Sequence, residues 1–457
     1  MSTINFGGLA TGLDTNSIID QLVGIERRRQ VGLLEIQQLE ATASQSALAT
    51  FNTKLTGVLS AAAALRDSSS SLDRKASSSD ETIIEATAGS GALTGSTQIT
   101  VNTLAREAIA TSSTGLTSET DTVASGAGTF EFQVGSGATQ TVNLTGSTTL
   151  ADLASEINNL GAGATASVVN VGTTASPDYR LRLSSDQTGS SSAVSITNDG
   201  TTIGVSVTQT AQNASLTVSG FATNFTRESN VVSDVIPGVT LELEKTGGPV
   251  TINVATDESA VSAKLQAVVD SFNDLASFVD QNSEVVQDTT TSDGDVAAGP
   301  LAFDSTVRTI LDGLRNNISN KVSGLGSQYT LLAELGIEST QEGKLKLDAS
   351  KLTTALSSDE DDVLEFFAGS GTNAGVFDRI HDYVSDVTKS GGILEIRTTG
   401  VADELESLQQ RIETGERNVD AYEGNLRAKF TSLEVLVSGL QSQSSFLLSA
   451  LGGTQPQ

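Results

Sequence analysis

The sequence predicts an α+β multidomain protein whose N- and C-terminal helices form a coiled-coil-like stalk, with a β-rich antiparallel head inserted between them. Residues 79–259 are rich in Thr, Ser, Gly and Val and contain short runs in which apolar and polar residues alternate, which is typical of half-buried strands. Residues 1–78 and 260–457 instead carry apolar residues at helical spacing. Because helix flanks the strands on both sides, we expect the two ends of the chain to meet.

The first motif, GGLATGLDT, has the glycine spacing that begins a phosphate-binding loop, because Gly7 and Gly12 bracket four residues. Such a loop needs Lys and then Ser or Thr after its second glycine. Here those positions hold Leu13 and Asp14, and a carboxylate repels phosphate. We therefore interpret the motif as a flexible lead-in to a helix.

A long helix is expected to follow this lead-in. The side chains of residues 14–17 can accept hydrogen bonds from the first helical N–H groups, and Ser17 with Asp20 has the spacing of a capping box. The helix is expected to end in the serine-rich stretch of residues 68–79. Its apolar positions are Ile18, Leu22, Ile25, Ile36, Leu39 and Ala43, and then, in a shifted frame, Leu48, Phe51, Leu55, Val58, Ala62 and Leu65.

In the middle of the chain, alternating runs bounded by Gly, Asn and Asp predict antiparallel strands. These runs include TIIEATA, TQITVNTL, TFEFQV, ASVVNV, YRLRLSS and VTINVAT. One amphipathic helix interrupts them, with Leu150, Leu153, Ile157 and Leu160 on one face. Strand signals near residues 80–105 and 205–258 indicate one domain with a second domain inserted in it.

The C-terminal part returns to helix and ends in the strongest periodic signal of the chain. A seven-residue repeat of this length predicts left-handed supercoiling against another helix, and residues 401–450 would span about 75 Å. Residues 1–78 are the expected partner. The first repeat position holds Leu405, Ile412, Val419, Leu426, Leu433, Leu440 and Leu447, and the second holds Leu408, Gly415, Tyr422, Lys429, Leu436, Gln443 and Ala450.

The second repeat position is mixed, because Gly415, Lys429 and Gln443 are poor seam residues. We therefore expect the paired helices to be completed by other subunits. An ordinary helical hairpin within one chain is the alternative.

Composition excludes several classes of protein. The chain has no cysteine, one histidine (His381) and a net charge of −29, so we expect no thiolate or multi-histidine metal site, no cofactor, no nucleic acid and no catalysis. The sequence has no run of eighteen apolar residues, so it does not predict membrane insertion. The N-terminus does not resemble a secretory signal peptide. The acidic runs at residues 359–362 and 293–295 are interpreted as a helix cap and a turn rather than as calcium sites.

The sequence resembles a known family, the flagellar filament-capping proteins, also called flagellar hook-associated protein 2. The resemblance is carried by FGGLATGLDTNSIIDQLVGIE, by VVSDVIPGVTLELEKTGGPVTINVATD with VVDSFNDL, and by GPLAFDSTVRTILDGL. It continues in LLAELGIESTQEGKLKLDASKLTTAL, VLEFFAG and LRAKFTSLEVLVSGLQSQSSFLLSAL. Relatives usually carry a proline near ERRRQVGL, whereas this helix has none, so a family-like bend near Arg29 is not expected.

The resemblance implies a non-enzymatic cap at the distal tip of the bacterial flagellum, secreted by the flagellar type III system without a cleaved signal peptide. It implies a homo-oligomeric ring of four to six subunits that helps flagellin to fold and insert at the growing tip and prevents its loss. Hook-filament junction proteins, and an export chaperone at the C-terminus, are further implied partners. The alternatives are another flagellar axial protein, such as flagellin or a junction protein, or an adhesin whose head binds host glycans or mucin.

Four structural parts are expected from this plan. Residues 1–45 and 410–457 form a terminal leg that is mobile when unassembled, and residues 46–78 and 260–409 form a helical stalk domain. Residues 79–112 and 205–259 form a β-rich head domain, into which a second β-rich domain, 113–204, is inserted. The expected contacts with other subunits or the filament are Leu13, Asp14, Ile18, Leu22, Ile25, Leu405, Leu408, Ile412, Val419, Tyr422, Leu426, Leu433, Leu436, Leu440 and Leu447.

Overall fold

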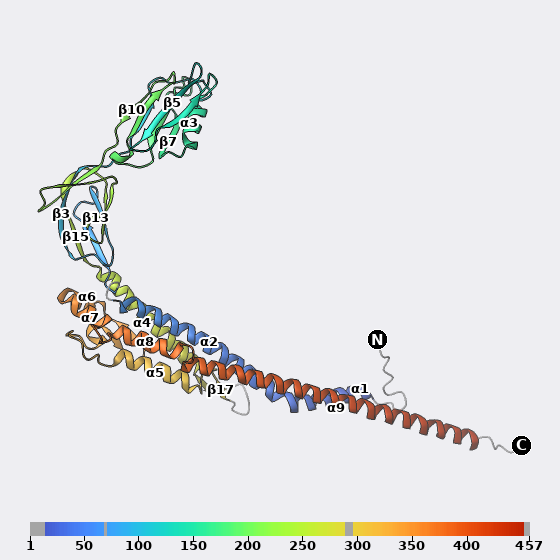
Figure 1. Cartoon of the computed structure of the whole chain (residues 1–457). Coiled ribbons are helices and arrows are strands. Elements are labelled where there is room, and N and C mark those ends of the chain that lie inside the picture. Colours follow the sequence, from blue (N-terminus) through green and yellow to red (C-terminus); the bar gives the residue numbers. More distant parts are fainter. Residues whose placement is uncertain (1–13, 68–70, 288–295, 452–457) are drawn as a thin grey trace. The chain divides into compact units, whose positions relative to one another are not determined.

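The computed structural model describes residues 14–67, 71–287 and 296–451, so the expected contact residue Leu13 and the acidic turn at 293–295 lie outside the described residues. The chain divides into two compact units (Figure 1). A helical unit contains residues 1–66 and 263–457, and a β-rich unit contains residues 67–262. The predicted fold class, two helical ends around an inserted antiparallel β region, is confirmed.

The helical unit begins with three consecutive helical segments, α1 (Thr15–Arg27), the π-helical turn η1 (Arg28–Gly32) and α2 (Leu33–Arg66). Asp14 caps α1, since its side chain accepts a hydrogen bond from the N–H of Ser17 at 3.1 Å. The predicted capping box of Ser17 and Asp20 is therefore wrong, because both residues lie inside α1. The prediction for α2 is confirmed, since Leu48, Phe51, Leu55, Val58, Ala62 and Leu65 are all fully buried.

Within this unit α2 packs against α7, α8 and α9. Asp359 caps α7 as expected, since it accepts from the N–H of Asp362. His381 lies on α8 as a helix-face histidine, with its Nδ1 2.7 Å from Nη1 of Arg66. The remaining elements are α4 (Glu258–Asn282), β16 (Val285–Gln287), β17 (Val296–Ala298), α5 (Ser305–Ser319), η3 (Leu332–Leu335), β18 (Ile337–Ser339), β19 (Leu345–Leu347), α6 (Ala349–Ser358), α7 (Glu360–Ala368), α8 (Val376–Thr388) and α9 (Ile393–Leu451).

The first part of the β-rich unit has a core between two antiparallel sheets, lined by residues such as Ile99, Leu216 and Leu241. The strand orders are β1-β15-β3-β11-β12 and β13-β14-β2. Their bounds are β1 (Arg74–Ser78), β2 (Ile84–Ala88), β3 (Gly95–Thr103), β11 (Ala214–Val218), β12 (Asn224–Arg227), β13 (Val231–Ile236), β14 (Val239–Leu243) and β15 (Gly247–Thr256).

The second part of the β-rich unit has its own core, which contains Phe130, Phe132 and Leu181. Its sheets have the orders β10-β4-β8-β7 and β6-β5-β9. The elements are β4 (Ile109–Ser112), β5 (Gly128–Val134), β6 (Gln140–Leu144), α3 (Leu150–Asn159), β7 (Ala164–Asn170), β8 (Tyr179–Ser185), η2 (Ser190–Ser192), β9 (Val194–Asp199) and β10 (Val205–Gln209).

Two predicted boundaries and one predicted buried position differ from the structure. The helical part was expected to reach residue 78, but α2 ends at Arg66 and residues 74–78 pair with β15 as an edge strand. The inserted domain was expected at 113–204, but β4 and β10 pair with each other and belong to its sheet. Leu160 was placed on the buried face of α3, but it follows the end of the helix and is 40% exposed.

Candidate assembly surface

The two ends of the chain pair along α9. This helix has 59 residues and is therefore about 88 Å long. Segments α1, η1 and α2 all contact it. The pairing is antiparallel, because Gln38 hydrogen-bonds Gln409, Arg27 pairs with Glu416, and Arg427 lies 3.9 Å from Asp20. The predicted meeting of the two ends is confirmed, and it occurs within one chain.

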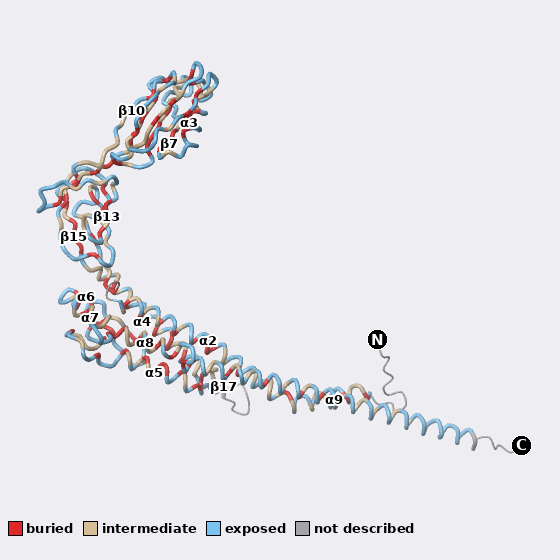
Figure 2. The backbone as a smooth tube through the Cα atoms, viewed as in Figure 1, coloured by how far each residue is buried: buried red, intermediate tan, exposed pale blue. Residues whose placement is uncertain are grey.

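The seven-residue repeat of α9 splits into two parts. In the first part, Leu408 and Val419 are buried, while Leu405, Ile412, Tyr422 and Leu426 are half-buried against the N-terminal helices. In the second part, residues 438–449 are all exposed, and Figure 2 shows this end of α9 as exposed along its length. We call residues 428–451 the α9 overhang. Its repeat positions Leu433, Leu436, Leu440 and Leu447 are each between 45% and 65% exposed.

Val31 and Gly415 make a close contact between the paired helices. Val31 is fully buried within η1. A Cβ atom added to Gly415 would approach Cγ2 of Val31 to 2.9 Å, which is closer than two carbon atoms can pack. The expectation that Gly415 is a weak position of the repeat is therefore wrong, since the missing side chain makes room for Val31.

The π-helical turn shifts the register of the N-terminal helix by one residue. Counting back in sevens from the buried Leu48 and Ala41 leads through Leu34 to Arg27 and then to Asp20. The structure instead buries Ile19 and keeps Asp20 exposed. A π turn holds one residue more than an α turn, so it replaces a carboxylate with an isoleucine in the seam.

Salt bridges and hydrogen bonds hold this turn in place. Nη2 of Arg27 lies 2.6 Å from Glu35 and 2.7 Å from Glu416, so it joins both sides of the turn to α9. The pKa of Glu26 is lowered, first because Arg29 donates a hydrogen bond to its carboxylate and then because Gln30 does so. The charged form of Glu26 therefore supports the turn.

Because of this shift, several predicted contact residues face away from α9. Ile18 is half-buried, and Leu22 and Ile25 are exposed. Sequence reasoning missed Ile19 and Val31, although the polar residues reached by counting back in sevens were a signal of an inserted residue. We call Leu22, Ile25, Leu33, Ile36 and Leu39 the outer stripe, since they are 36% to 71% exposed.

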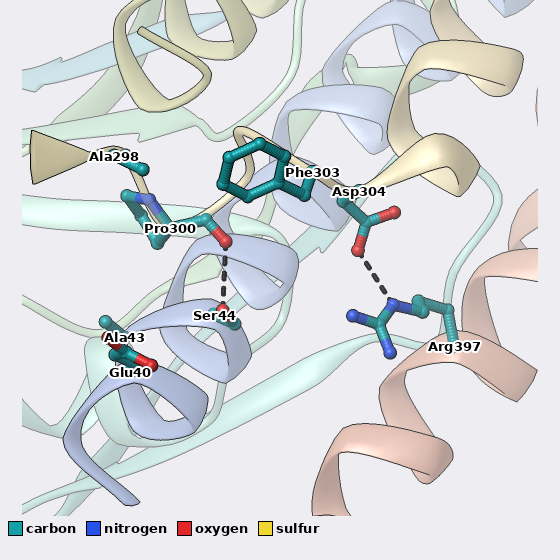
Figure 3. A pocket seen from close by; sticks show the side chains of 9 residues that line it. Glu40, Ala43, Ser44, Ala298, Pro300, Phe303, Asp304 and Arg397 are labelled. Carbon is teal, nitrogen blue, oxygen red and sulfur yellow. Dashed lines mark hydrogen bonds and ion pairs between the residues drawn. The ribbon is translucent and has the colours of Figure 1, made fainter. Parts of the chain in front are cut away.

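A groove runs between α2 and α9 and begins at a hollow of about 380 Å³. Figure 3 shows Asp304 and Arg397 joined on one side of this hollow, and Ser44 and the backbone of Pro300 joined on the other. The side chain of Asp304 is only 4% exposed, and it also accepts from the N–H groups of Thr306 and Val307 at the start of α5. The aromatic ring of Phe303 stands at the rim and is 83% exposed.

The described residues offer surfaces for binding. Within the described ranges, no cluster of three or more His, Cys, Asp or Glu side chains could hold a metal ion. No described helix combines the length and the apolar character that crossing a bilayer requires. The large uncovered features of the described residues are helical: the apolar outer stripe, the α9 overhang, and the groove, whose lining is mostly polar.

These features define a class of protein, an assembly subunit whose paired ends leave an apolar helical surface uncovered. Family models for the N-terminus and the C-terminus of flagellar hook-associated protein 2 match residues 11–108 and 211–442. Flagellar hook-associated protein 2 of Escherichia coli O157:H7 is 31% identical over 98% of both chains. The B-type protein of Pseudomonas aeruginosa is 27% identical over 97% of this chain and 95% of its own. The chain belongs to the flagellar hook-associated protein 2 family.

A solved structure agrees with this assignment. The crystal structure of the flagellar cap protein FliD from Escherichia coli, domains D1-D2-D3, is similar to this chain with a TM-score of 0.60 and 29% sequence identity. The likeness covers 78% of this chain and 99% of that one.

Proposed function

We propose that the chain is a subunit of the structural cap at the distal end of the bacterial flagellar filament. In this role an oligomeric ring promotes the folding and insertion of flagellin at the growing tip and prevents flagellin from being lost. Membership of the flagellar hook-associated protein 2 family supports the role, as does the likeness to a flagellar cap protein. Flagellin, junction proteins and adhesins are not favoured by these comparisons.

One observation carries the mechanism: the repeat of α9 continues past the N-terminal helices without a described partner. A fully buried leucine contributes about 1.5–3 kcal/mol relative to an exposed one, so Leu433, Leu440 and Leu447 offer considerable binding energy. Lys429 and Gln443 interrupt the second repeat position and remain exposed. Such a surface binds a neighbour and also releases it, which a cap needs as each new subunit adds beneath it.

The terminal leg is proposed to be loosely ordered in a free subunit and to become ordered against neighbouring subunits and the filament end. The cost of ordering is then met when contacts form. The uncovered residues Leu22, Ile25, Leu433, Leu436, Leu440 and Leu447 are the proposed contacts. Export by the type III system, a ring of four to six subunits, a chaperone bound to the C-terminus, and contact with junction proteins belong to the same proposal.

A double substitution tests the proposed role of the α9 overhang. Leu433→Asp with Leu440→Asp changes two exposed side chains beyond the seam, so the purified protein should keep its fold and melting temperature. Cells that carry it should lose filament growth and release monomeric flagellin into the medium. The matched control, Ser432→Asp with Ser442→Asp, alters exposed polar residues of the same helix and should leave growth intact. Normal filaments in the leucine variant would refute the proposal.

Binding of host glycans or mucin by the β-rich unit stays a prediction, because no described feature of that unit favours it. A direct binding assay with the full chain and immobilised mucin would test it. Saturable binding that the free glycan competes would favour an adhesive role in addition to capping.

A further inference from the structure

The groove between α2 and α9 has the length of a helix. Three hollows follow one another along it. The first and second share Glu40, Ser44 and Arg397, and the second and third share Ser407 and Arg411. From Arg397 to Asn418, at its far end, the groove extends for about 32 Å.

The two banks of the groove differ in character. On the α2 bank, Leu33 and Ile36 lie seven and four residues before the lining residue Glu40, so they share its side of the helix, and both are exposed. On the α9 bank, the lining residues Ser407 and Thr414 carry small hydroxyl side chains and alternate with the charged residues Glu404 and Arg411. Exposed apolar side chains beside one bank and polar side chains on the other suit an amphipathic helix that has one leucine side and one serine side.

The α9 overhang has this character and this length. Its 24 residues extend for about 36 Å. Leucines at positions 433, 440 and 447 mark one side, and Ser438, Ser442, Ser445 and Ser449 lie on the opposite side of the helix. The overhang cannot reach the groove of its own chain, because α9 is one continuous helix from Ile393 to Leu451. Another copy of the chain can supply it.

Charge also favours contact between copies at this place. Each chain has a net charge of −29, so two copies repel one another elsewhere on their surfaces. The overhang contains one lysine and one glutamate, for a net charge of zero. The groove is lined by two arginines and three acidic residues, for a net charge of −1: Arg397, Arg411, Glu40, Asp304 and Glu404. The two surfaces can therefore approach with little repulsion.

We propose that the α9 overhang of one copy lies in the α2–α9 groove of a second copy, with its leucine side against Leu33 and Ile36. This proposal rests on the proposed function, since it names the partner that covers the overhang in the cap. Contact of the overhang with flagellin alone, or with the N-terminal residues of its own chain, would contradict this proposal.

Cysteine cross-linking of the full chain tests the proposal directly, because the chain has no cysteine of its own. A Leu33→Cys variant is mixed with Leu433→Cys, Leu440→Cys or Leu447→Cys, which cover successive helical registers, and the mixture is mildly oxidised. The matched control is Ser442→Cys, on the opposite side of the same turn as Leu440. We expect a disulfide-linked heterodimer from at least one leucine position, in about tenfold higher yield than from position 442, since the bond needs close Cβ atoms.

Two results would overturn the proposal. One is an equal yield from positions 440 and 442 at every register. The other is linkage only between two copies that carry the same overhang cysteine, which would mean that overhangs pair with each other. If the Leu433→Asp, Leu440→Asp variant stops filament growth while no heterodimer forms, the capping role stands and this interface is wrong.

Discussion

The side chain of Val31 packs against the backbone of Gly415 where the two ends of the chain pair. Val31 belongs to the π-helical turn, which adds one residue to the N-terminal helix. Gly415 is the position of α9 at which a side chain would collide with it. The seam therefore combines a missing side chain on one helix with a π-helical turn on the other, and this turn takes up the extra residue.

Gly415→Ala should weaken the pairing of the two ends. The added methyl group would lie 2.9 Å from Cγ2 of Val31, and overpacking of this kind costs about 1–3 kcal/mol. Chemical unfolding followed by the helical circular dichroism signal measures the loss. Gly424→Ala is the control, because nothing lies within 4 Å of its added Cβ, and it should leave stability unchanged or raise it by up to about 1 kcal/mol. Equal effects of the two substitutions would contradict the proposed role of Val31.

Deletion of Arg29 should preserve the seam, whereas insertion of one further residue should destabilise it. With one residue fewer, the turn becomes ordinary α-helix, and counting back two heptads from Leu34 then reaches Ile19, which stays buried. The deletion should therefore cost about 1 kcal/mol or less, the value of the exposed ion pair that Arg29 makes with Glu26. An alanine inserted after Arg29 exceeds what one π turn takes up, so α1 rotates by about 100° and Ile19 leaves the seam, at an expected cost of about 2–4 kcal/mol. Unfolding curves that coincide for the two variants would count against a register-setting turn.

Asp304→Ala should loosen the start of α9. The nearly buried carboxylate both caps α5 and accepts a hydrogen bond from Nε of Arg397 at 2.7 Å, so its removal should cost about 2–4 kcal/mol. Arg397→Met removes only the ion pair and leaves the cap, so it should cost about 1–2 kcal/mol. Thermal unfolding of both variants checks the order, and a larger loss from Arg397→Met would show that the cap contributes little.

Acid should weaken the π-helical turn through Glu26. Its pKa is lowered in the folded chain by hydrogen bonds from Arg29 and Gln30. The folded state therefore favours the charged carboxylate, and the stabilisation is present above the ordinary pKa and is lost as the pH falls through the lowered pKa. Between about pH 3 and pH 5, the stability of Glu26→Gln should fall less steeply than that of the unaltered chain. If the stability of Glu26→Gln and of the unaltered chain fell in parallel over this range, Glu26 would not contribute to the stability of the turn.

The fold was predictable where one periodicity persists over many residues. The buried positions of α2 from Leu48 to Leu65 follow an uninterrupted helical pattern, and strands such as β8 alternate with a period of two, so local pattern and tertiary packing agree. Domain boundaries were less predictable, because β1, β4 and β10 are short strands whose assignment depends on pairing with distant strands. Pairing of this kind leaves no trace in a local window of sequence.

The candidate surface was predictable in kind and not in detail. The repeat from Leu405 to Leu447 predicted the helix that pairs with the N-terminal residues. The sequence did not show which part of this helix α1, η1 and α2 contact. Sequence reasoning missed the buried residues Ile19 and Val31 because the extra residue of the turn shifts the helical pattern before it by about 100°. A glycine in a repeat can leave a gap between two helices or allow them to pack closely. The position of Val31 shows that Gly415 allows close packing.

The central claim is that the α9 overhang is covered by other subunits in the assembled cap. Hydrogen exchange of the full chain, measured once for the free protein and once for the protein bound to filament ends, tests this claim most directly. We predict that amides of residues 431–449 exchange rapidly in the free protein and become protected on binding, while those of residues 48–65 are protected in both states. Equal exchange of residues 431–449 in the two states would contradict the account.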